Sequence, residues 1–118
     1  MLQNLALLYL AIAHGTDQSL TDDELEVMVR RLRDWAPELS EDDVKMVILE
    51  ASAVYLHGDR DAEIEQAMLS IRAEADVIDR LLALDGLIEV ADADGVRLAS
   101  EDGLIEALRD IWQLNPQG

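Results

Sequence analysis

Residues 7–15 read LLYLAIAHG, and residues 87–95 repeat the same pattern as LIEVADADG. Each segment ends in a glycine, Gly15 or Gly95, which a short loop and a hydroxyl residue follow. Beyond the hydroxyl residue, apolar residues again recur at intervals of three and four. A unit of this kind is a helix-loop-helix, and each copy must bury its apolar face, for which the other copy is the obvious partner. The repeat therefore predicts an all-α fold with two related helix-loop-helix halves.

Length and composition predict one domain, residues 1–118. A chain of this size buries roughly two thirds of the surface that it exposes when unfolded, which is enough for a core without metal or disulfide staples. Cysteine is absent, which excludes disulfides, thiolate metal sites and cysteine nucleophiles.

Acidic residues dominate the charge, with 26 Asp and Glu against 9 Lys and Arg and a formal net charge of -17. This charge repels nucleic-acid phosphates and anionic membrane surfaces, so we expect no nucleic-acid partner and no membrane insertion. Half of the residues are apolar, which excludes a disordered acidic tail. The apolar stretch at residues 5–13 lacks a positive flank and is far shorter than the ~20 residues that span a bilayer. We expect a cytoplasmic protein.

Apolar residues recur at intervals of three and four along the whole chain, which predicts a compact bundle of about six helices. The first helix, over residues 2–14, is apolar on nearly every side, as suits a buried central helix. Hydroxyl and acidic residues mark the expected helix starts, and glycines or prolines mark the ends. The expected N-caps are Thr21, Ser40, Asp61 and Ser100, the expected stops are Gly15, Pro37, Gly58, Gly95 and Pro116, and a break is expected within residues 73–76.

The glycine stop, short loop, Ser or Thr cap and acidic helix occur twice in a domain of this length, and this tandem resembles the TerB-like domain. That family is related to the N-terminal region of DjlA-type co-chaperones, and the resemblance covers nearly the whole chain. It implies a compact helical bundle associated with tellurite resistance, stress response and metal sensing, often as a module beside membrane or chaperone proteins.

The two copies depart from the TerB-like pattern in different places. The pattern has an Asp before each glycine and a Glu in the first turn of the next helix. The first copy has His14 for the Asp and keeps Glu24, whereas the second keeps Asp94 and has Gly103 for the Glu. Two equivalent acidic sites are therefore not expected.

Carboxylates crowd the end of the fifth expected helix, where Asp85, Glu89 and Asp92 share one face and Asp94 precedes the glycine. Each opposes the negative end of the helix dipole at a cost of a few tenths to ~1 kcal/mol, so something cationic should offset them. One reading is a divalent cation, Ca²⁺ or Mg²⁺, because both take carboxylate and carbonyl oxygens. The other is a solvated acidic end neutralised by Arg97 or by counterions.

Read as a calcium loop, the segment from Val90 places Asp92, Asp94 and Glu101 at ligand positions three, five and twelve. Val90 stands where an EF-hand has its first Asp, so a true EF-hand is not expected and any affinity should be modest. Asp102 adds a further carboxylate in the next helix, where either it or Glu101 can replace the missing family Glu, and Glu89 is a tentative additional ligand.

The first repeat offers a weaker set of candidate metal ligands, which consists of His14, Asp17 and Glu24. If two helix ends meet, His14 and Asp17 could also join His57 and Asp59 in a transition-metal site. Both histidines precede a glycine at a helix end, however, and there the favoured reading is a cap that complements the dipole.

No nucleophile motif, phosphate-binding glycine loop or paired acid and base is present, so no enzyme activity is expected. The leading hypothesis is a non-enzymatic stress-response module whose acidic surface binds a partner protein, with a divalent cation at the loop before the last helix. The alternatives are a metal-independent acidic adaptor or inhibitor that docks a basic partner, and a small hydrolase with carboxylates on two metals. The sequence leaves the oligomeric state open.

Overall fold

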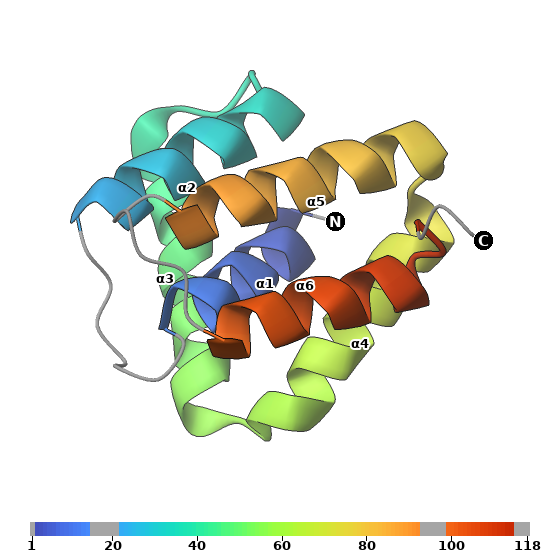
Figure 1. Cartoon of the computed structure of the whole chain (residues 1–118). Coiled ribbons are helices and arrows are strands. Elements are labelled where there is room, and N and C mark those ends of the chain that lie inside the picture. Colours follow the sequence, from blue (N-terminus) through green and yellow to red (C-terminus); the bar gives the residue numbers. More distant parts are fainter. Residues whose placement is uncertain (1, 15–21, 93–98, 115–118) are drawn as a thin grey trace.

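The computed structural model describes residues 2–14, 22–92 and 99–114, and these form six α-helices without a strand (Figure 1). The described part therefore confirms the all-α fold class. The helices are α1 (Leu2–His14), α2 (Asp22–Trp35), α3 (Glu41–His57), α4 (Arg60–Glu74), α5 (Val77–Asp92) and α6 (Ala99–Ile111).

Helix α1 is the centre of the bundle, as its apolar sequence predicts. Residues 5–10 are all buried, and α1 contacts α2, α3, α4 and α5. In Figure 1, α2, α5 and α6 lie side by side, and α1 runs behind them. A helix that is apolar on every side is stable in water only when other helices cover it on every side, so α1 organises the packing of the rest.

The two repeat halves meet through α5. Both α1 and α2 of the first half pack against α5, whereas α6 packs against α5 and α4. Trp112, just beyond α6, is fully buried and donates a hydrogen bond from its indole nitrogen to the carbonyl of Met68 in α4, at 2.9 Å. The second repeat half therefore packs against α4, which lies between the two halves in the chain, as well as against the first half.

The described helix starts confirm one of the expected caps and correct two others. Ser40 caps α3 in a reciprocal capping box with Asp43. The cap of α4 is Asp59, not Asp61, because the Asp59 side chain accepts from the backbone nitrogen of Ala62 while Asp61 lies in the first turn. Ser100 is also not a cap, because α6 already includes Ala99.

The expected break between the fourth and fifth helices is confirmed at Ala75 and Asp76. Asp76 caps α5 by accepting a hydrogen bond from the backbone nitrogen of Asp79, at 2.8 Å. Arg80 then donates to the carbonyls of Ala75 and Trp112, each at 3.0 Å, and so joins the ends of α4 and α6.

Two of the expected helix ends are confirmed, and the last helix ends earlier than expected. Gly58 is the C-cap of α3, and α2 ends at Trp35, two residues before Pro37. The last helix ends at Ile111, well before Pro116. Thr21, Gly15, Gly95 and Pro116 lie outside the described residues. No described helix is long and apolar enough to cross a bilayer.

Candidate functional site

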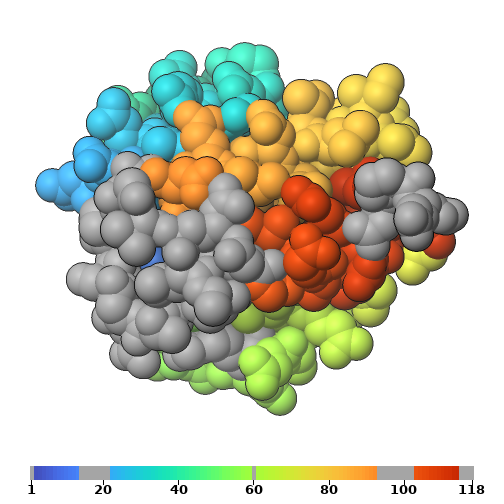
Figure 2. Space-filling view, viewed as in Figure 1, coloured from blue at the N-terminus to red at the C-terminus, as the bar shows by residue number. Residues whose placement is uncertain are grey.

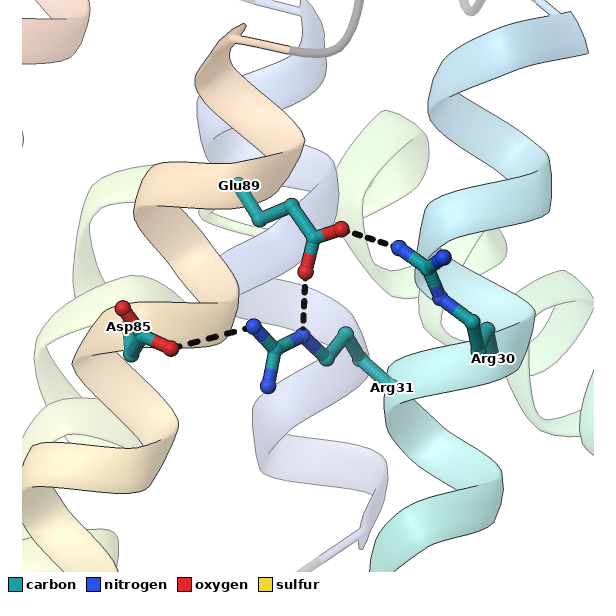
Figure 3. A network of polar contacts seen from close by, with 4 residues as sticks. All are labelled: Arg30, Arg31, Asp85 and Glu89. Atoms are coloured by element: carbon teal, nitrogen blue, oxygen red, sulfur yellow. Dashed lines mark hydrogen bonds and ion pairs between the residues drawn. The ribbon is translucent and has the colours of Figure 1, made fainter.

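Two arginines of α2 and two carboxylates of α5 form an ion-pair cluster between these helices (Figure 3). Arg31 Nε donates to Glu89 Oε1 at 2.5 Å, and Arg31 Nη2 donates to Asp85 Oδ2 at 3.0 Å. Arg30 Nη2 donates to the other oxygen of Glu89. Both oxygens of the Glu89 carboxylate therefore accept hydrogen bonds from guanidinium groups.

The helical period explains why these four side chains meet. Asp85 and Glu89 are four residues apart and so lie on one face of α5, while the consecutive Arg30 and Arg31 lie at the edge of α2 that packs against it. None of the three arginine–carboxylate pairings has a local sequence signal, because the partners are 54 to 59 residues apart.

The cluster differs from an ordinary surface ion pair in the partial burial of Arg31, whose side chain is 23% exposed. Burial acts against the charge of Arg31, but its hydrogen bonds with Glu89 and Asp85 outweigh that effect and raise the pKa of the guanidinium above its usual value. The sequence analysis expected a metal ion, Arg97 or counterions to offset the α5 carboxylates. For Glu89 and Asp85, the arginines of α2 supply this positive charge.

A buried phenol lies beneath this cluster. Tyr9 of α1 is fully buried, and within the described part of the chain its hydroxyl makes no hydrogen bond of normal geometry. Burial raises the pKa of the hydroxyl well above its usual value, while the charge of Arg31 acts in the opposite direction. Gly86 of α5 leaves the space that the hydroxyl occupies, because a Cβ at residue 86 would lie 2.6 Å from the Tyr9 oxygen.

Glu24 is the one charged side chain that is buried among those described, with 3% exposure in the first turn of α2. It stands where the TerB-like pattern has a Glu in the first turn of the helix after the loop. A carboxylate there is favoured by the positive end of the helix dipole, which is a structural reason for its presence.

The family model described as tellurite resistance protein TerB matches residues 3–118. The chain belongs to the TerB family. The match includes residues of all six helices and therefore both helix-loop-helix copies. Comparisons with curated proteins and with solved structures find no match.

The described residues include only some of the candidate metal ligands predicted in the second TerB repeat. Asp92 is exposed at the last residue of α5, and Glu89 lies one turn before it in the arginine cluster. Glu101 and Asp102 lie in the first turn of α6, but their side chains are outside the described part. Asp94 lies wholly outside it.

The described residues likewise include only some of the candidate ligands of the first TerB repeat. Glu24 is buried, as described above, and His14 is the last residue of α1, with its side chain outside the described part. Asp17 lies outside it. His57 is exposed at the end of α3, and Asp59 caps α4. Among the described residues, no three His, Asp or Glu side chains are grouped as metal ligands would be.

Sequence reasoning missed the arginines of the cluster and the phenol beneath it. The run of acidic residues on α5 could be recognised from spacings of four and three, whereas Tyr9 is one apolar residue among many in α1. The one sequence signal for a special contact was Gly86, a glycine within an otherwise helical pattern.

Proposed function

We propose that this chain is a non-catalytic, cytoplasmic module of the tellurite-resistance or stress-response type that binds a partner protein through its acidic surface. The observation that carries the proposal is the TerB match over residues 3–118. The net charge of -17 supports a partner with a basic surface, because such a charge steers basic partners toward the domain and keeps nucleic acid away.

The second part of the proposal is a divalent cation, Ca²⁺ or Mg²⁺, bound by the connection between α5 and α6. The proposed ligands are Asp92, Asp94, Glu101 and Asp102, with Glu89 as a tentative addition. The support is their position, because α5 ends at Asp92 and α6 begins at Ala99, so all but Glu89 belong to one short connection and its two ends. A bound cation would tie these ends together and fix a binding face.

A specific observation favours the alternative, an acidic adaptor that needs no metal. Arg30 and Arg31 both pair with Glu89, and Arg31 also pairs with Asp85, so the protein itself neutralises the middle of the α5 acidic face. In this alternative the remaining carboxylates stay solvated until a basic partner covers them.

Thermal unfolding of EDTA-treated protein separates the two readings. The melting temperature is measured with and without millimolar Ca²⁺, Mg²⁺, Mn²⁺ or Zn²⁺ at matched ionic strength. The test variant is Asp92→Asn with Asp94→Asn. The control is Glu50→Gln with Glu65→Gln, which removes the same charge from exposed sites on α3 and α4.

A selective rise in melting temperature that the test variant loses and the control keeps supports the cation site. A rise no larger than that caused by ionic strength alone contradicts it and leaves the metal-independent adaptor.

A further inference from the structure

The outer face of the first half of α5 is apolar and uncovered. Val77, Ile78, Leu81 and Leu82 are 56%, 68%, 49% and 50% exposed, and their spacing places them on one side of the helix. Figure 2 shows this part of α5, in yellow, at the surface of the molecule. We call these four residues the α5 patch. Grouped large apolar side chains of this kind mark interaction sites on soluble domains.

A cavity of about 250 Å³ adjoins the α5 patch between α2 and α5. Leu82 belongs both to the patch and to the cavity wall, and Trp35 of α2 forms another part of the wall. A cavity beside an apolar surface accepts one anchoring side chain of a partner, and such anchors dominate the affinity of small interfaces.

Three carboxylates lie beside this apolar surface. Asp34 and Asp79 line the cavity, and Asp76 immediately precedes the patch. Of the two neighbouring arginines, Arg31 pairs with α5 carboxylates, whereas Arg80 donates to two backbone carbonyls and keeps its positive charge. Three carboxylates at the edge thus stand against the single charge of Arg80. The edge of the patch is therefore acidic, and it complements a positively charged partner.

We propose that the α5 patch and its cavity bind a basic amphipathic helix of a partner protein. An apolar side chain of that helix enters the cavity beside Trp35 and Leu82, and its Lys or Arg side chains face Asp34, Asp76 and Asp79. This is the helix-in-groove mode of recognition, with basic residues added on the flanks. The inference rests on the proposed acidic interaction and assigns it to one surface.

A second copy of the chain fits this surface less well. Two copies would bring the same acidic edges together, with a net charge of -17 on each chain. The patch spans only six residues, or about 9 Å of helix, which is short for the buried area of a stable dimer. A short amphipathic segment of opposite charge has neither disadvantage.

Titration of ¹⁵N-labelled protein with a Lys/Leu amphipathic peptide of about 14 residues tests the proposal, with a Glu/Leu peptide of the same apolar pattern as the charge control. The test variant is Ile78→Ser with Leu82→Ser. The matched control is Met46→Ser with Leu49→Ser, which removes similarly exposed apolar side chains from α3. Circular dichroism checks that both variants remain helical.

We expect the Lys/Leu peptide to shift amide signals of residues 77–82 of α5 and residues 31–35 of α2. The dissociation constant should rise about tenfold or more in the α5 variant and stay unchanged in the α3 variant. Binding should weaken between about 0.05 M and about 0.5 M NaCl, and the Glu/Leu peptide should not bind.

Four results would overturn the inference. Signals that shift elsewhere, or equal losses in both variants, place the interaction on another surface and leave the proposed acidic function intact. Failure of the Lys/Leu peptide to bind at all contradicts both. Sedimentation that shows a dimer, dissociated by Ile78→Ser with Leu82→Ser, assigns the patch to contact between copies.

Discussion

Gly86 lies in the middle of α5, where glycine destabilises a helix by roughly 1 kcal/mol relative to alanine. The structure explains its presence by the Tyr9 hydroxyl, which lies 2.6 Å from the place of a Cβ at residue 86. The next nearest Tyr9 atom, Cζ, would lie at 3.5 Å, an ordinary van der Waals distance. The Tyr9 hydroxyl is therefore the only group that would clash with the Cβ of an alanine at residue 86, among the contacts of the described residues.

A double-mutant cycle tests this contact. Gly86→Ala should lower the free energy of unfolding by about 1–3 kcal/mol in the natural chain, because a buried ring has little freedom to move away. In the Tyr9→Phe background the same change should raise it by up to about 1 kcal/mol, because only the helix propensity of alanine remains. Urea unfolding of the four proteins gives the coupling. Additive effects would show that the hydroxyl does not restrict residue 86.

Tyr9 also predicts how stability depends on alkaline pH. Its pKa is raised in the folded protein, so above the usual value of 10.0 the unfolded chain loses the proton while the folded chain keeps it. Ionisation then favours unfolding, and stability should fall as pH rises beyond about 10. Tyr9→Phe should make this fall shallower in urea unfolding series measured at increasing pH. Parallel curves for the two proteins would contradict the assignment.

Gln113, after the end of α6, has a φ of 59°, which favours glycine. The backbone nitrogen of Leu114 donates to the carbonyl of Arg109, and that of Gln113 donates to Asp110, which together form a Schellman motif. Gln113→Gly should therefore raise the free energy of unfolding by about 0.5–1 kcal/mol. As a control, Gln66→Gly within α4 should lower it by about 1 kcal/mol. A loss of stability in both variants would argue against strain at residue 113.

At the scale of elements, the arginine cluster joins α2 to α5 through one carboxylate above all. Glu89→Gln should lower the free energy of unfolding by about 1–2 kcal/mol, because it removes the charge that compensates the half-buried Arg31. The control, Glu106→Gln, removes the partner of Arg109 in a surface pair within α6 and should cost less than about 0.5 kcal/mol. Thermal or urea unfolding measures both, and equal costs would show that the cluster behaves as a surface pair.

Helix boundaries were predictable from the sequence where a signal is local. The cap at Ser40 and the break before α5 depend on residues a few positions apart, and both are confirmed. The start of α4 was placed two residues late, because Asp59 and Asp61 are both competent caps and only the backbone conformation at Asp59 distinguishes them. Local chemistry therefore determines that a helix starts, but not always at which of two acidic residues.

Only the acidic half of the candidate site was predictable from the sequence. The acidic face of α5 follows from spacing, but the cations that meet it come from α2, 54 to 59 residues earlier. Nothing in the local pattern of Arg30 and Arg31 distinguishes them from the other charged residues of α2. Such pairings depend on how α2 and α5 pack, which single-sequence periodicity does not determine.

At the scale of the whole molecule, 26 acidic against 9 basic residues should make self-repulsion a larger electrostatic effect than the few ion pairs. Adding NaCl to about 0.5 M should therefore raise the melting temperature, because screening reduces the repulsion. Differential scanning calorimetry at several NaCl concentrations measures the effect. A melting temperature that falls with salt would mean that the arginine cluster outweighs the net charge.

The central position of α1 also bears on how the protein is made. Every helix that covers α1 follows it in the chain, from α2 through to α5. While the ribosome synthesises these helices, the apolar residues 5–10 wait without their final neighbours, and exposed segments of this kind invite aggregation or chaperone binding. Among the described helices, the most deeply buried one is thus also the first to be synthesised.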